Sequence, residues 1–338
     1  LGGFGREALQ ALRYRVIDRF GGLDRVPCWK YIYIDSDPKS VNEALTGPPE
    51  QAFQPQEIYH APLMGVAGYR KHRQSLELIS EWISSERLYS IPRSLAVAGV
   101  RSLGRLALTE NHLRIAAKMK RDIQALLDIE GLEQTATMTG LEPGIETPQI
   151  IIFAAAGGGT GSGMLIDVAY TCRRLLQEQG IGDQEIYAHL FCGSPTDMMT
   201  PAVEKGNIYA TLTEINHYSH PEAIFTAKYR PGTQPIEDSG PPFKSVYLSR
   251  VGRRSHGTTR EVASRMACYV FNDLATPLNR LLGPSRAEQY DKIGTNFRSF
   301  GTYNVWYPRG LMLRIASRQA AQRLIKQWLD DQPTKRMD

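Results

Sequence analysis

The sequence has 338 residues, of which 42% are hydrophobic, enough for one large α/β domain with extra elements or for two domains. Its formal net charge of +5 is spread along the chain without a basic tail, so nucleic-acid binding is not indicated. No apolar run approaches the roughly 20 residues of a membrane span, and no signal peptide opens the sequence, which together predict a cytoplasmic protein.

The four cysteines, Cys28, Cys172, Cys192 and Cys268, are scattered without CxxC spacing. This pattern supports neither a zinc site nor a disulfide framework, and we expect buried small side chains. The seven histidines show no pairing pattern, and no metal site is identified.

The chain opens with LGGFG, which is typical of a glycine turn, and a helical stripe of apolar residues follows up to Phe20. Since no strand precedes this turn, we expect that a first strand of the sheet is missing from the sequence. Residues 31–34 then predict a short strand that ends in Asp35-Ser36-Asp37-Pro38. We expect a turn there, in which Pro38 prevents an immediate helix.

This opening has an alternative interpretation as a dinucleotide-binding site. Gly2, Gly3 and Gly5 before a helix, followed by an acidic residue such as Asp37 at the end of the next strand, are close to the fingerprint in which a carboxylate holds the ribose. Taken alone, the segment would predict an NAD(P)-dependent oxidoreductase. A second glycine loop far downstream argues against a simple dinucleotide fold.

The middle of the chain alternates loops and helices. Residues 46–56 predict a loop and residues 75–82 a helix, and residues 95–98 predict a short strand. A glycine-bearing turn over residues 99–104 then leads into a helix over residues 105–127. Residues 130–147 contain three glycines, a proline and several threonines, and they predict a loop.

The most informative stretch is IIIFAAAGGGTGSG, at residues 150–163. Its unbroken apolar start is typical of a strand covered on both faces in a parallel sheet. The glycines that follow let successive backbone N–H groups approach an anion, and an amphipathic helix begins at residues 160–163 with its positive end toward the loop. We therefore predict phosphate binding at residues 157–163.

The loop GGGTGSG resembles the signature phosphate loop of the tubulin/FtsZ superfamily of GTPases, GGGTG[ST]G, and it is not a Walker A loop because no GK[ST] follows. The resemblance implies a doubly wound α/β fold with a mostly parallel sheet. It also implies binding of GTP or GDP, with Mg²⁺ beside GTP, and a homo-oligomer or filament as the assembled state.

The resemblance also assigns site residues. Gly2, Gly3 and Gly5 fall in step with the opening turn of FtsZ, and Arg101 in the 99–104 turn is placed to meet the γ-phosphate. Glu204 and Asn207 look like the Glu…Asn pair of tubulins, Glu204 as the ribose contact. The nucleotide-binding residues that we expect are Gly2, Gly3, Gly5, Asp37, Gly99, Arg101, Gly157, Gly158, Gly159, Thr160, Gly161, Ser162, Glu204, Asn207 and Asn272.

Later elements continue the same pattern. Residues 186–191 and 245–248 predict strands, residues 207–218 predict a helix, and residues 221–242 are polar with five prolines. The long helix over residues 259–282 resembles the core helix of the family. Asn272 on that helix sits where tubulins read the guanine edge, although the family usually has a further asparagine where this chain has SRVGRR, at residues 249–254.

We expect a nucleotide-binding domain over residues 1–282 and a C-terminal segment over residues 283–338, with a strand at 300–306 and an amphipathic helix at 311–329. The family's second domain would therefore be reduced or absent. In the family, a loop after the core helix completes hydrolysis in the neighbouring subunit. Here that loop spans residues 283–296, with Glu288 and Asp291 as its carboxylates and candidate catalytic residues.

Three functions stay open from the sequence. The first is a tubulin/FtsZ-like GTPase whose hydrolysis depends on self-assembly. The second is a protein of the same fold that binds nucleotide without hydrolysing it, in a structural or regulatory role. The third is an NAD(P)-dependent oxidoreductase, for which we find no hydride-site general acid in a recognisable context.

Overall fold

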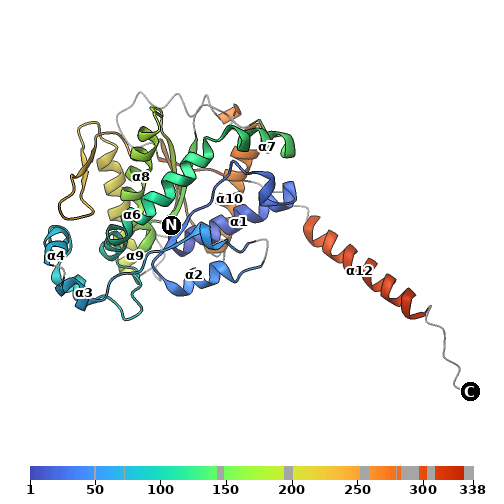
Figure 1. Ribbon diagram of the computed structural model, residues 1–338, viewed down its shortest axis with the longest axis horizontal. Helices are drawn as coiled ribbons and strands as arrows, with labels where there is room; N and C mark the ends of the chain where they lie inside the picture. Colours follow the sequence, from blue (N-terminus) through green and yellow to red (C-terminus); the bar gives the residue numbers. More distant parts are fainter. Residues whose placement is uncertain are drawn as a thin grey trace, which may run out of the picture. The chain divides into compact units, whose positions relative to one another are not determined.

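The computed structural model describes residues 1–48, 51–71, 73–142, 148–193, 201–251, 259–278, 280–282, 297–302 and 309–330 (Figure 1). The chain divides into two compact units, Leu1–Gly301 and Thr302–Asp338. Among the described residues, no helix is both long enough and apolar enough to cross a bilayer.

The first unit is built on a parallel sheet of four strands in the order β3-β4-β7-β8. Phe153 of β3 lies opposite His189 of β4, which in turn lies opposite Tyr247 of β7. The strands are β3 (Gln149–Ala155), β4 (Glu185–Phe191), β7 (Ser245–Ser249) and β8 (Phe297–Arg298). The predicted doubly wound α/β fold with a mostly parallel sheet is therefore confirmed.

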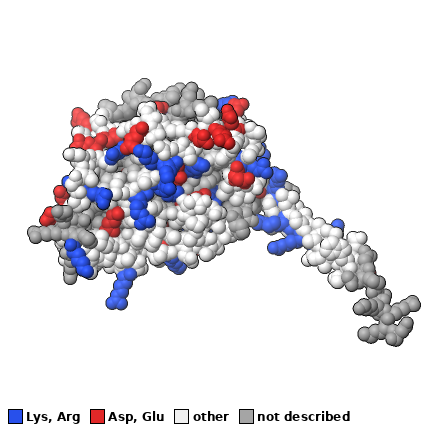
Figure 2. All heavy atoms as spheres, viewed as in Figure 1, with Lys and Arg blue, Asp and Glu red and all other residues white. Residues whose placement is uncertain are grey.

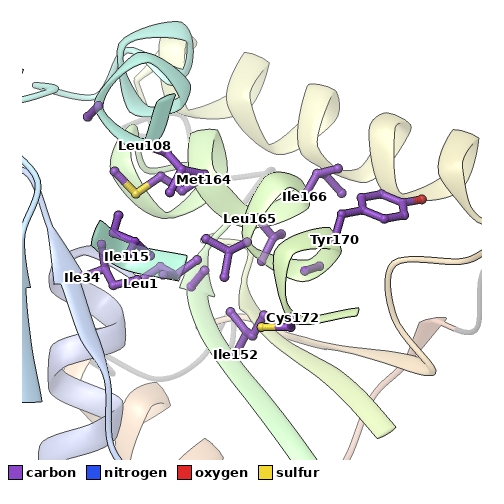
Figure 3. Close-up of a cluster of buried hydrophobic side chains, with 14 of the residues drawn as sticks. Leu1, Ile34, Leu108, Ile115, Ile152, Met164, Leu165, Ile166, Tyr170 and Cys172 are labelled. Atoms are coloured by element: carbon purple, nitrogen blue, oxygen red, sulfur yellow. The ribbon is translucent and has the colours of Figure 1, made fainter. Parts of the chain in front are cut away.

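Helices cover both faces of this sheet. Alternate residues of each strand point to opposite faces, so every strand contributes side chains to two cores. Ile152, Ala188 and Val246 face the core under α6 (Arg101–Leu126) and α8 (Thr160–Glu178). Figure 3 shows Ile152 beside the Cys172 side chain and below the Leu165 side chain, both of α8. Phe153, Tyr187 and Tyr247 face the opposite core, under α1 (Gly2–Phe20) and α10 (Thr259–Ala275). β3 is thus apolar without alternation because helices cover both of its faces, as the sequence predicts.

Two small sheets flank the main one. β1 (Tyr33–Asp35) pairs in parallel with β2 (Ile58–His60), and β5 (Phe225–Ala227) pairs antiparallel with β6 (Ile236–Asp238). The other helices are α2 (Pro38–Leu45), α3 (Val66–Lys71), α4 (Arg73–Ser80), α5 (Ser85–Tyr89), α7 (Ile129–Thr139) and α9 (Ala202–Tyr218), with 3-10 turns at Leu23–Arg25 and Pro55–Glu57.

The free edge of β3 pairs with no strand among the described residues. A cavity of about 150 Å³ runs along this edge, with Ile34, Ile150 and Ile152 among its lining residues. The strand expected before Leu1 falls outside the sequence, and it stays a prediction.

Several expected boundaries are wrong at the start of the chain. Gly2, Gly3 and Gly5 lie in the first turns of α1 instead of in a separate turn. Pro38 does not prevent a helix but begins one, because the first helical position needs no N–H donor. The carboxylate of Asp37 caps α2 by accepting from the amide of Lys39 at 3.1 Å.

Other differences follow from single residues. Leu95 and Ala98 have positive φ angles of 58° and 49°, so residues 95–98 are irregular instead of forming a strand. The core helix α10 ends at Ala275, because Thr276 precedes a proline and is disfavoured in the α region, and residues 278 and 280–282 are helical again after this break.

Two segments that were expected to be irregular contain regular structure. The threonine-rich segment 130–147 contains most of α7, whose end is marked by Gly140 with a φ of 71°. The polar segment 221–242 contains the β5–β6 hairpin. α9 also begins five residues before the predicted start, at Ala202.

The described part of the second unit is α12 (Arg309–Asp330). It confirms the amphipathic helix that the sequence predicts at residues 311–329. Its large apolar side chains are exposed, among them Leu313, Leu324 and Trp328. The strand expected at residues 300–306 is replaced by β8 at Phe297–Arg298, and residues 303–308 lie outside the described ones.

The four cysteines are all buried and free, as expected. Burial raises the pKa of the Cys192 thiol to about 11 and that of Cys172 to about 12. Both side chains therefore stay protonated near neutral pH and act as small apolar groups.

Candidate functional site

The N-terminal ends of α1, α6 and α8 meet at the carboxyl end of β3, and glycines allow their close approach. A Cβ on Gly104 of α6 would overlap the carbonyl oxygen of Gly159 and lie 3.1 Å from its carbonyl carbon. A Cβ on Gly2 of α1 would lie 3.3 Å from the amide nitrogen of Gly161. Side chains at these positions would hold the three helices apart, so the sequence needs glycine there.

The loop between β3 and α8 presents free backbone donors. Within the described residues, the amides of Gly157 and Gly159 donate no hydrogen bond, whereas that of Gly158 donates to the Ala155 carbonyl oxygen at 3.2 Å. The first N–H groups of α8 also lack intrahelical acceptors, and the helix dipole makes this end positive. These donors together form a cradle suited to an anion of phosphate size.

Ser36 joins β1 to this cradle, and the sequence analysis missed it. Its hydroxyl lies 3.0 Å from the Thr160 hydroxyl at the start of α8, and it accepts from the amide of Val97 at 3.2 Å. The neighbouring carboxylate of Asp35 is buried and accepts from the Tyr33 hydroxyl at 2.6 Å. The only available signal was the position of Ser36 directly after the carboxyl end of a strand.

Helix α9 contacts the cradle from the other side. The side-chain amide of Asn207 donates to the carbonyl oxygens of Gly99 and Gly157, both at 2.9 Å. Glu204 lies over the loop, since a Cβ on Gly157 would be 3.2 Å from its Oε1. Both residues therefore lie at the glycine loop, while the ribose contact expected of Glu204 stays a prediction.

Arg101 is placed differently from the expectation. Its guanidinium forms a two-pronged ion pair with Glu214 of α9, with one N–O distance of 3.0 Å, and it also donates to the Ser162 carbonyl oxygen at 3.2 Å. These contacts engage the group that was expected to meet a γ-phosphate. In this structure Arg101 connects α6, α8 and α9.

An ion pair between a half-buried arginine and a buried aspartate connects α6 to α8 beside the cradle. Arg105 approaches the Asp167 carboxylate at 3.4 Å, and the Tyr229 hydroxyl donates to the same carboxylate at 2.9 Å. Burial raises the pKa of Asp167, while Arg105 and Tyr229 oppose that shift by stabilising the charged form.

The structure does not bring Asn272 to the cradle. The neighbouring Phe271 packs against Phe20, with ring centroids 6.0 Å apart, at the C-terminal end of α1. Gly2 marks the opposite end of this 19-residue helix, about 28 Å away at 1.5 Å per residue. A side chain cannot span that distance, so Asn272 does not reach the glycine loop, and we expect it to make no contact with a nucleotide held in the cradle. Glu288 and Asp291 lie outside the described residues.

Charged side chains of both signs are mixed on the face shown in Figure 2, where Lys and Arg lie beside Asp and Glu. Lys120 and Arg174, for example, both pair with Glu178. This mixing agrees with the modest net charge of +5.

Fold and site together define a doubly wound α/β protein with a glycine-lined cradle at the carboxyl ends of its parallel strands. The chain belongs to the tubulin-like family, whose model matches residues 1–326. The expected resemblance to the tubulin/FtsZ superfamily is thereby confirmed. No curated protein matches the sequence.

Solved structures of tubulin-like proteins are similar to this chain at low identity. CetZ from Methanosaeta thermophila is 12% identical with a TM-score of 0.43, and the match covers 86% of this chain and 54% of the CetZ chain. GDP-bound CetZ1 from Haloferax volcanii is 11% identical with a TM-score of 0.39, covering 80% and 56%. TubZ from Bacillus thuringiensis serovar israelensis, in a GTPγS-form protofilament, is 12% identical with a TM-score of 0.38, covering 73% and 49%. The chain thus spans about half the length of these proteins.

Proposed function

We propose that this protein binds a guanine nucleotide, with the phosphates in the cradle over residues 157–163. The observation that carries the proposal is the set of free amides at Gly157, Gly159 and the start of α8, where three helix N-termini converge. Membership of the tubulin-like family favours GTP or GDP over other nucleotides.

The residues present fit Mg²⁺ as well. Mg²⁺ is bound mainly by phosphate oxygens and water, with one or two protein carboxylates. Asp37 follows Ser36, whose hydroxyl contacts Thr160, and only one oxygen of its carboxylate caps α2. Asp37 would hold the ion at the mouth of the cradle, where Mg²⁺ supplies charge neutralisation for the terminal phosphates.

The nucleotide that co-purifies with the protein tests the ligand. We expect heat-denatured protein to release GDP or GTP, identified by chromatography against standards. Release of an adenine dinucleotide alone would refute the proposal and favour the oxidoreductase that Gly2, Gly3 and Gly5 first suggested.

We propose further that hydrolysis depends on self-assembly into oligomers or filaments. The proposal rests on family membership and on the engagement of Arg101 by Glu214, which keeps this cation from the phosphates. A group from a neighbouring subunit, with Glu288 and Asp291 as the candidates, would then be needed to position the attacking water.

Phosphate release measured over a range of protein concentrations tests this dependence. We expect the rate per molecule to rise steeply with concentration. A constant, brisk rate in dilute monomeric protein would show that one subunit holds all the catalytic groups. No release at any concentration would favour a protein that binds nucleotide without hydrolysing it.

A further inference from the structure

One side of α9 carries four polar residues that all reach the cradle or the turn beside it: Glu204, Asn207, Thr211 and Glu214. Their spacings of three and four residues place them on a single stripe of the helix. We call these four residues the α9 stripe. Its neighbour on the outer side of the helix, Tyr209, is 75% exposed.

Asn207, in the middle of the stripe, connects two separate loops. Asn207 uses both of its amide hydrogens, one on the Gly99 carbonyl oxygen and one on the Gly157 carbonyl oxygen. Gly99 belongs to the turn before α6, and Gly157 belongs to the loop before α8. One side chain therefore fixes the distance between the two segments from which the cradle is built.

Thr211 acts one turn further along the helix. Its hydroxyl is fully buried and lies 3.0 Å from the Ala156 carbonyl oxygen and 2.7 Å from that of Asn207. A trans peptide is planar, with its C=O and the next N–H on opposite sides. Since the Ala156 carbonyl points toward α9, the amide of Gly157 points away from this helix, and it donates no hydrogen bond to any described residue.

We propose that the α9 stripe sets the conformation of the phosphate loop and that Asn207 is a positioning residue instead of a base-reading one. This inference rests on the proposed nucleotide binding. Its consequence is that the stripe governs affinity for the phosphate chain whatever base is attached. Glu214 completes the device by holding Arg101 at the start of α6.

Binding of a ligand without a base separates the two roles. We would measure the affinities of GTP, ATP and inorganic triphosphate for the full chain by calorimetry. The variants are Asn207→Ala, the isosteric Thr211→Val, Thr211→Ser, which keeps the hydroxyl, and the outward control Tyr209→Ala. Thermal unfolding without ligand monitors the folding of each one.

We expect Asn207→Ala and Thr211→Val each to weaken GTP and inorganic triphosphate by the same factor, on the order of tenfold for a lost hydrogen bond that leaves a buried partner. Thr211→Ser should restore the affinity, and Tyr209→Ala should leave it unchanged. If the role of these residues were purely structural, the variants would have a lower unfolding temperature, but they would not lose affinity for both ligands and Thr211→Ser would not restore it.

Two results would overturn the inference while leaving the proposed function intact. In the first, Asn207→Ala weakens GTP but not inorganic triphosphate, which would make Asn207 a base-reading residue. In the second, folded Thr211→Val binds both ligands as tightly as the unmodified protein. If the unmodified protein binds neither GTP nor triphosphate, the proposed function itself is wrong and the inference falls with it.

Discussion

Replacing Gly158 by alanine should separate ligand binding from folding. In the folded chain a Cβ at this position would lie 3.5 Å from the Ala155 carbonyl oxygen and 3.6 Å from the Ala155 Cβ, which are ordinary contacts. Gly158 is not among the glycines with positive φ. We therefore expect the free energy of unfolding without ligand to change by less than about 1 kcal/mol.

The same methyl group should prevent phosphate binding, because it stands between the loop amides and an anion that has to approach them closely. A ligand present at 100 times its Kd stabilises a protein by about 2.7 kcal/mol. We expect GTP at that level to give the unmodified protein this stabilisation and to give Gly158→Ala almost none.

Urea unfolding with and without GTP and Mg²⁺ measures both quantities on the same samples. Gly206→Ala is the matched control, since a Cβ at Gly206 meets no atom within 4 Å. Gly104→Ala is the contrasting variant, because its Cβ would overlap backbone atoms of Gly159, and we expect a loss of about 1–3 kcal/mol even without ligand. If GTP stabilises Gly158→Ala as much as the unmodified protein, the loop does not bind phosphate as we argue.

Three further predictions concern residues outside the loop. Burial raises the pKa of Glu110 from 4.5 to about 8, so its contribution to stability is present below about pH 4.5 and is lost as the pH rises through about 8. Urea unfolding at several pH values should thus show the unmodified protein weakening relative to Glu110→Gln toward alkaline pH, and parallel curves would contradict this. Arg13 is 1% exposed and pairs with Glu57 at 2.6 Å. Arg13→Ala should therefore lower the free energy of unfolding by about 3 kcal/mol, because it leaves the Glu57 carboxylate unpaired. A loss below about 1 kcal/mol would show that water replaces the arginine as the partner of this carboxylate. Asn272→Ala should leave GTP affinity and the preference over ATP unchanged in competition assays, whereas a reduced preference would return this residue to the base site.

Much of the phosphate loop could be predicted from the sequence because its determinants are local. The apolar run of β3, the glycines at residues 157–161 and the amphipathic α8 are adjacent in the chain, so strand, loop and helix follow from periodicity and from the lack of side chains on the glycines. Local sequence patterns gave wrong predictions where the same residue type is compatible with two backbone structures. Pro38 begins α2 instead of preventing it, and Leu95 and Ala98 adopt positive φ in a segment with the composition of a strand.

The arrangement around the loop was decided by tertiary structure. Ser36 meets Thr160 across 124 residues, and Asn207 meets Gly99 across 108, and no local pattern encodes such contacts. Asn272 shows the converse. It is an asparagine on the helix where the resemblance predicts one, but it lies near the end of α10 that is far from the cradle. The sequence by itself determined that a strand ends in a glycine loop at the start of a helix, because these three segments are neighbours in the chain. Which distant side chains shape that loop depends on how α1, α6, α8 and α9 pack together, and this packing is a property of the folded chain alone.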